Sequence, residues 1–183
     1  MANIIAFGAS NSSSSINKTF ATWAATQLQG ANVTVLDLND YEMPIYSIDR
    51  ERSTGIPVEA AKFKKYLREA DGIVVSFAEY NGSYTSGFKN IFDWISRLDG
   101  PIWENKPMLL LAAAPGGRGA KAVLDNAVWK FPFQGGEVAG SFSLPFFKDN
   151  FGEEGITDSE LAEEFGKQFK AFEEALQNEA VGV

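Results

Sequence analysis

The stretch GIVVSF-AEYNGSYT-SGFKNIFDWISRL, residues 72–98, joins a short apolar run to an amphipathic segment through a polar loop. An apolar run such as 72–77 is typical of a strand buried on both faces of a parallel sheet. Between Ser86 and Leu98, large apolar side chains recur three or four residues apart, which is typical of a helix that packs one face on a sheet. The stretch therefore predicts one strand–loop–helix unit.

The same unit recurs along the chain. We expect further strands at 3–8, 32–38, 107–114 and 137–142, and further helices at 16–28, 57–69, 119–131 and 157–176. Parallel strands need long crossover connections, and each interval between these strands holds a helix. The pattern predicts an α/β fold with a three-layer, doubly wound, five-stranded parallel sheet, flavodoxin-like, in strand order 2-1-3-4-5. We expect 39–56 to be a long polar connection.

Length and composition indicate a single domain over residues 1–183. Hydrophobic residues make up 45% and charged residues 22% of the chain, an ordinary globular balance. The net charge of -8 argues against nucleic acid as a partner, because that binding relies on clustered Lys and Arg. No segment has the length of a membrane span or the layout of a secretory signal. We therefore expect no membrane partner and a cytoplasmic location.

The chain contains no His and no Cys. This excludes Ser-His-Asp triads, cysteine nucleophiles, thiolate or imidazole zinc sites, and iron–sulfur clusters. Any chemistry must come from carboxylates, hydroxyls and Lys, or from a cofactor that brings its own reactive atoms. We expect the cofactor, with no catalytic side chain and no metal site.

Three unusual loops follow the first, third and fourth expected strands: GASNSSSSIN at 8–17, SFAEYNGSYTSG at 76–87 and APGGRGA at 114–120. In doubly wound sheets, ligands bind at the carboxyl ends of the strands, where these loops would meet. Small hydroxyl residues before a helix suit an anion, and tyrosines with small residues suit a flat ring. Each loop alone also fits a structural turn, with Ser15 as a helix N-cap and 114–120 as a glycine-rich bend.

Three motifs resemble the NADPH-dependent FMN reductases of flavodoxin-like fold, a family that includes chromate, quinone and azo-dye reductases. Residues 9–17 match Gly-Ser-x-Arg-x-x-Ser-x-Asn, with Ala9 for Gly and Ser12 for Arg. Residues 78–94 match Pro-Glu-Tyr-Asn-x-Ser-x-x-Gly-x-Leu-Lys-Asn-x-x-Asp-Trp, with Ala78 for Pro and Phe88 for Leu. Residues 115–119 match a Pro-Gly-x-x-Gly loop, and the resemblance covers about 1–140.

The resemblance implies FMN as cofactor and assigns residues to its two ends. The FMN phosphate would be held by Ser10, Ser12, Ser15, Ile16 and Asn17. The isoalloxazine ring would be lined by Glu79, Tyr80, Asn81, Gly82, Pro115, Gly116, Gly117 and Gly119. The change from Arg to Ser12 removes a charge-assisted hydrogen bond that contributes about 1.5–3 kcal/mol, and hydroxyls and helix N–H groups would compensate for part of this loss.

The resemblance also implies an activity: an NAD(P)H-dependent FMN reductase that works by ping-pong hydride transfer. NADPH or NADH would give hydride to the flavin and leave, and a flavin, quinone or similar small acceptor would then take its place. Arg118 is a candidate for the nicotinamide phosphate, although a lone Arg in a loop is more often simply solvated. A homodimer or homotetramer is expected, paired through the helices after strands three and four, which include 88–94 and Trp129.

Two alternatives belong to other classes. The chain would otherwise be a flavodoxin-type electron carrier or an FMN-binding protein with no turnover of its own, although its first loop lacks the Thr-rich pattern of such carriers. The other reading is a cofactor-free scaffold that acts through protein contacts.

Overall fold

The centre of the molecule is a parallel sheet of five strands in the order β2-β1-β3-β6-β7. The computed structural model describes residues 1–181, and the side chains of residues 1–178. The five strands are β1 (Asn3–Ala9), β2 (Asn32–Leu36), β3 (Gly72–Phe77), β6 (Lys106–Ala113) and β7 (Gly136–Leu144). All four pairings are parallel. Numbered among themselves, the strands follow 2-1-3-4-5, so the predicted flavodoxin-like fold is confirmed.

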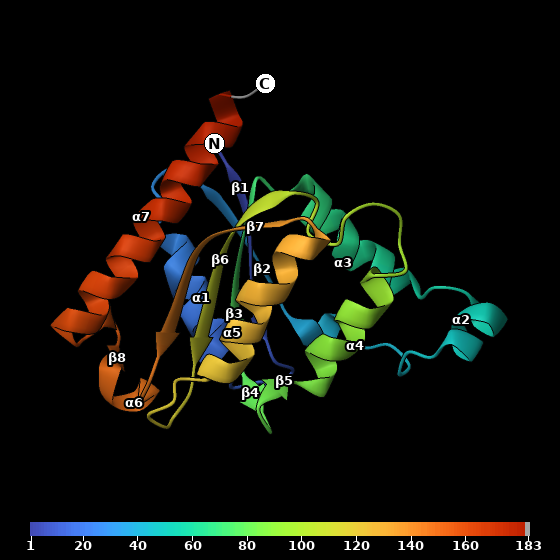
Figure 1. The fold of residues 1–183 in the computed structure, drawn as a ribbon, viewed down its shortest axis with the longest axis horizontal. Helices are drawn as coiled ribbons and strands as arrows, with labels where there is room; N and C mark the ends of the chain where they lie inside the picture. The colour runs from blue at the N-terminus through green and yellow to red at the C-terminus, as the bar shows by residue number, and fades with distance from the viewer. Residues whose placement is uncertain (182–183) are drawn as a thin grey trace.

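Helices cover both faces of this sheet (Figure 1). One face carries α1 (Ile16–Thr26) and α7 (Ser159–Val181), and the other carries α3 (Val58–Glu69), α4 (Ser86–Ile95) and α5 (Lys121–Lys130). The period of two along a strand divides the core: in β1, Ile4 and Ala6 face the α1 side, whereas Ile5 and Phe7 face the α4 side. Every residue of β3 is buried, as its apolar run predicted.

The stretch 39–56 is not the plain connection that the sequence predicted. The second strand ends early, at Leu36, because the Asp37 carboxylate accepts the Asn39 N–H (2.9 Å) and starts a 3-10 helix, η1 (Leu38–Tyr41). A short helix, α2 (Ile48–Thr54), follows, with Ser47 as its cap. None of the residues of α2 is buried, so it leaves no apolar period in the sequence.

Several short elements were also not predicted. They are the hairpin of β4 (Glu79–Tyr80) and β5 (Ser83–Tyr84), η2 (Phe131–Gln134), α6 (Phe147–Asn150), and the hairpin of β8 (Phe151–Gly152) and β9 (Gly155–Ile156). The helix expected from residue 119 begins at Lys121, because Gly119 and Ala120 both have a φ of 59° and lie outside the helical region.

Strands β1, β3 and β6 are neighbours and end at the same edge, which is the lower edge in Figure 1. The loops that follow them therefore converge there. Within residues 1–181, no helix combines the length and the apolar character that crossing a membrane requires.

Candidate functional site

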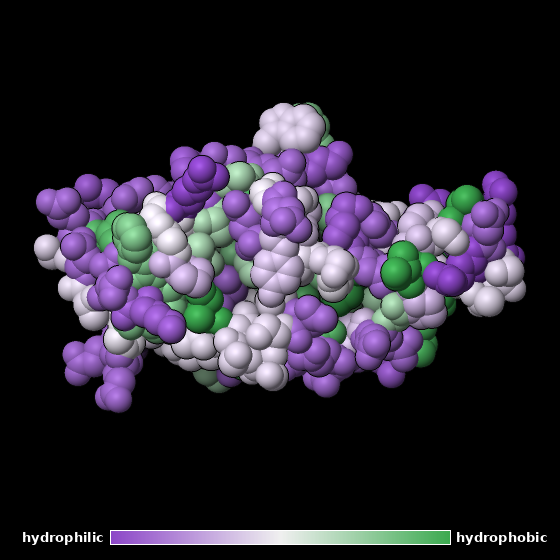
Figure 2. All heavy atoms as spheres, turned by 90° about the horizontal axis from the view of Figure 1, so that it is seen from below, coloured by the Kyte–Doolittle hydropathy of each residue, from purple (hydrophilic) through white to green (hydrophobic). Residues whose placement is uncertain are grey.

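A cavity of about 240 Å³ lies where β1, β3 and β6 end, and we call it the strand-end cavity. The three predicted loops all contribute to it. Its lining consists of Ser10, Ser12, Ser14, Ser15, Ile16, Asn17, Ala78, Glu79, Tyr80, Ala113, Ala114 and Pro115. Figure 2 looks onto this edge of the molecule and shows weakly polar, pale residues across its middle, with hydrophilic residues toward both ends.

The first loop presents hydrogen-bond donors at the start of α1. The Ser15 Oγ accepts the Lys18 N–H (3.2 Å) and caps the helix, and the Ser10 Oγ accepts the Ser12 N–H (3.2 Å). These two buried hydroxyls hold the shape of the loop. In the described part of the chain, no hydrogen bond engages the N–H groups of Ile16 or Asn17. Together with the exposed hydroxyls of Ser12 and Ser14, they can receive an anion.

The side chain of Asn17 makes its hydrogen bonds within the protein. Its Nδ2 donates to the Ala113 carbonyl (3.0 Å), and its Oδ1 accepts from the Ala113 N–H (2.9 Å) and the Ser76 Oγ (2.7 Å). Only 2% of Asn17 is exposed. The side chain therefore fastens α1 to β3 and β6, and only its backbone N–H remains for a ligand.

The second loop is a tight hairpin rather than an open loop. Asn81 (φ 53°) and Gly82 (φ 72°) are its two turn residues, and both are in the left-handed conformation that a two-residue turn of this kind requires. Both are exposed, and neither lines the strand-end cavity. An Asn-Gly pair between two strands is a strong sequence signal for such a hairpin. Tyr80, which is 53% exposed, does line the cavity.

Glu79 and Thr85 connect this hairpin to its neighbours. The Glu79 Oε2 accepts the Val123 N–H (3.0 Å) in the first turn of α5, so the only carboxylate in the cavity lining is engaged by a helix N-terminus. The Thr85 Oγ1 donates to the Ala9 carbonyl (3.0 Å) and accepts the Phe88 N–H (3.2 Å). Thr85 was not predicted, although a Thr just before a helix is an N-cap signal.

The glycines of the third loop serve different purposes. A Cβ at residue 117 would lie 2.7 Å from the Phe146 ring, and one at 119 would lie 2.2 Å from the Ser143 Oγ. A Cβ at Gly116 would meet nothing within 4 Å. Packing against the end of β7 and the residues that follow it accounts for Gly117 and Gly119, and Gly119 also has a positive φ of 59°. Only Gly116 leaves open space for a ligand. None of the three lines the cavity, whereas Pro115 does.

The cavity lining carries no basic side chain. Lys18 is the basic residue of the first loop and α1. Its Nζ lies 2.5 Å from the Asp37 Oδ2, and this hydrogen bond lowers the pKa of Asp37. Arg118 is exposed on the third loop. The Tyr84 hydroxyl is buried and has no hydrogen-bond partner among the described residues, and burial raises the pKa of Tyr84.

Two further residues of the second motif hold the segment that leads to α2. The Asn90 Nδ2 donates to the Met43 carbonyl (3.0 Å), and the Trp94 Nε1 donates to the Pro44 carbonyl (2.8 Å). The Tyr46 N–H donates to the Asn90 Oδ1 (2.8 Å). These motif residues therefore support the fold rather than line the cavity.

Comparison with known proteins gives a family model described as NADPH-dependent FMN reductase, which matches residues 2–172. A quinone reductase of Escherichia coli (strain K12) is 35% identical over 75 residues, 41% of this chain and 40% of that protein. An NADPH azoreductase of Bacillus sp. (strain OY1-2) is 31% identical over 107 residues, 58% of this chain and 55% of the relative. The chain thus spans about two fifths to half of the length of these curated relatives.

Among solved structures, the flavoenzyme FerB of Paracoccus denitrificans, an NAD(P)H:(acceptor) oxidoreductase, superposes with a TM-score of 0.76. The superposition covers 97% of this chain and 98% of FerB at 20% sequence identity. At that identity, the likeness establishes a shared fold.

Proposed function

Because the chain belongs to the NADPH-dependent FMN reductase family, we propose that it binds FMN in the strand-end cavity and passes electrons from NADPH or NADH to a small acceptor. One observation carries the proposal. The cavity joins a set of N–H and O–H donors at the start of α1 to an aromatic and small-residue wall made by Tyr80, Ala114 and Pro115. This combination suits a molecule with an anionic end and a flat ring.

The residues present fit the phosphate of FMN. The free N–H groups of Ile16 and Asn17 and the hydroxyls of Ser12 and Ser14 would hold it, and the α1 dipole favours a negative charge there. The one carboxylate in the lining, Glu79, accepts the Val123 N–H at the start of α5, where the helix dipole offsets part of its negative charge. Ser10 and Ser15 would act mainly by holding the loop in shape.

The ring end would rest on the second and third loops. Tyr80, Pro115 and Gly116 would lie against it, while Asn81, Gly82, Gly117 and Gly119 would act by shaping the two loops. When bound, FMN supplies the ring that accepts and donates electrons. The protein then needs only to bind, orient and provide N–H groups, which agrees with a chain that has no His and no Cys.

We propose a ping-pong order, in which the nicotinamide leaves before the acceptor enters. A site for one drug-sized molecule usually measures about 300–1,000 Å³. The strand-end cavity, at about 240 Å³, is smaller than this range, so the nicotinamide and the acceptor would occupy the same space in turn rather than together. The names of the relatives suggest a quinone or an azo compound as the acceptor.

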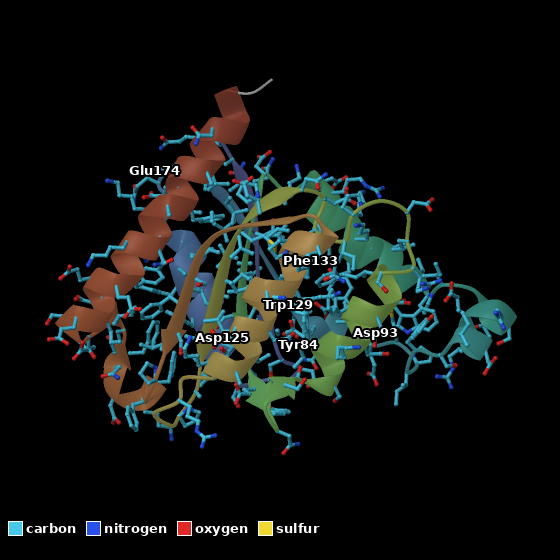
Figure 3. All side chains as sticks on the ribbon, in the orientation of Figure 1. Tyr84, Asp93, Asp125, Trp129, Phe133 and Glu174 are labelled. Atoms are coloured by element: carbon cyan, nitrogen blue, oxygen red, sulfur yellow. The ribbon has the colours of Figure 1, made fainter. Side chains whose placement is uncertain are left out.

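We also propose that the protein is a homodimer or a tetramer built from such dimers. Trp129 and Phe133 are 64% and 73% exposed, and their ring centroids are 5.7 Å apart. Figure 3 shows both on the α5 side of the molecule. Phe88 and Trp94, which were expected to take part in pairing, are fully buried and cannot contact a partner. Trp129 and Phe133 are therefore the residues we assign to the contact.

An anaerobic titration tests the function. The purified protein is mixed with FMN, its absorption spectrum is recorded, and NADPH or NADH is added without air. Prompt bleaching of the flavin bands supports the reductase. Bound FMN that stays oxidised supports an electron carrier instead, and no FMN binding at micromolar concentration contradicts the proposal. Riboflavin serves as the control, because it has the ring but lacks the phosphate.

A further inference from the structure

Phe146 stands out because its backbone and its side chain are both unusual. Its φ of 46° and ψ of 52° place it in the left-handed conformation, where a bulky residue is a clear outlier. Half of the residue is exposed (50%), so burial of the side chain offsets only part of the energy that this backbone conformation costs. Such outliers persist when the surrounding structure holds them, and they concentrate at functional sites.

The surroundings of Phe146 hold it against the third loop. The Phe146 N–H donates to the Gly116 carbonyl (3.3 Å), and the Phe147 N–H donates to the Ala114 carbonyl (3.0 Å). The Ser143 Oγ donates to the Gly119 carbonyl (2.8 Å). The segment 143–147 therefore braces the third loop along its whole length, although the two segments are about 25 residues apart in sequence.

The ring of Phe146 fills the space that a side chain at residue 117 would occupy. A Cβ there would lie 2.7 Å from the Phe146 Cζ and 3.1 Å from its Cε2. Gly117 is not among the glycines with positive φ, so its backbone does not require glycine. The ring is thus the physical reason for the glycine at 117, and the two residues form one contact.

We infer that Phe146 is a positioning residue for the FMN ring, acting through the third loop. The inference rests on the proposed function. Phe146 does not line the strand-end cavity, whereas Ala114 and Pro115 of the braced loop do. Through its contact with Gly117, the Phe146 ring sets where Pro115 and Gly116 meet the cofactor. The left-handed backbone is what turns the ring onto the loop.

Replacement of the ring tests the inference. We expect F146G to weaken binding of both FMN and riboflavin by about tenfold, as loss of a contact that supports ligand residues does at metal sites. The absorption spectrum of the bound flavin should shift toward that of free FMN. F146Y keeps the ring and should bind both flavins within about twofold of the wild-type protein. Affinity is measured from the fluorescence change of the flavin on binding.

A double substitution separates positioning from general stability. G117A should weaken flavin binding, because its methyl group displaces the Phe146 ring, whereas G117A combined with F146G should bind like F146G alone. Equal flavin affinities and spectra for wild-type protein and F146G, with only the unfolding temperature changed, would overturn the inference and leave the proposed function standing. A wild-type protein that binds neither flavin contradicts the proposed function, and the inference with it.

Discussion

At the scale of single residues, Glu79 joins the second loop to α5 through one hydrogen bond from the Val123 N–H (3.0 Å). We expect E79A to lower the free energy of unfolding by about 1–2 kcal/mol, as loss of a helix cap does. E79Q keeps an acceptor oxygen and loses only the charge at the helix N-terminus, so its cost should stay below about 1 kcal/mol. Urea unfolding of both variants measures the difference, and equal costs would contradict this role of the hydrogen bond.

A substitution at Ser12 is expected to change the affinity for the cofactor rather than the stability of the fold. An Arg there adds a cation to a cavity lining that has none. We expect S12R to strengthen FMN binding by about ten- to hundredfold, which corresponds to about 1.5–3 kcal/mol. Riboflavin binding should not change, since riboflavin lacks the phosphate, and added salt should reduce the gain.

The neighbouring Ser13 provides the matched control for Ser12. It is exposed and does not line the strand-end cavity. S13R adds the same charge to the same loop, so an equal gain in S13R would show a general electrostatic effect rather than a contact with the phosphate.

At the scale of elements, Lys64 holds α3 to the segment that leads into β6. Its side chain is 2% exposed, and its Nζ lies 2.9 Å from the Glu104 Oε1. The Nζ also donates to the Ile102 carbonyl (2.9 Å) and to the Pro101 carbonyl. Burial lowers the pKa of Lys64, and the Glu104 carboxylate opposes this shift. The ammonium group thus supports a segment in which Glu104 and Asn105 are left-handed (φ 55° and 57°).

We expect K64M to lower the free energy of unfolding by about 1–3 kcal/mol, because the mostly buried Glu104 then keeps only Arg68, whose Nε lies 3.4 Å from its Oε1, as an ion-pair partner. The next residue is the control: Lys65 pairs with Glu69 at 3.7 Å, and both side chains are largely exposed (71% and 62%). K65M should cost less than about 1 kcal/mol. Chemical unfolding compares the two, and a small cost for K64M would show that the buried pair contributes little.

At the scale of the whole molecule, the exposed Trp129 and Phe133 predict self-association. A central Trp at a protein interface often contributes about 2 kcal/mol or more. The double variant W129S/F133S should therefore weaken association by about thirtyfold or more. Sedimentation velocity over a range of concentrations measures this. V58S removes another exposed apolar side chain (59% exposed), from α3, and should leave association unchanged.

The sequence alone was enough to predict the architecture and the place of the candidate site in it. A strand or helix that buries one face shows a period of two or 3.6 residues in its sequence. Because each connection between strands is short and holds one helix, only a few topologies are possible. The strand order and the meeting of loops 8–17, 76–87 and 114–120 could therefore be predicted. Motif spacing also predicted the family, which the match over residues 2–172 confirms.

Only the tertiary structure decided which partners each candidate site residue has. The Asn17 side chain bonds to a partner 96 positions away, and Gly117 is a glycine because of Phe146. The physical reason is that periodicity records whether a residue is buried, whereas its partner is set by packing between segments distant in the chain, which no local pattern encodes.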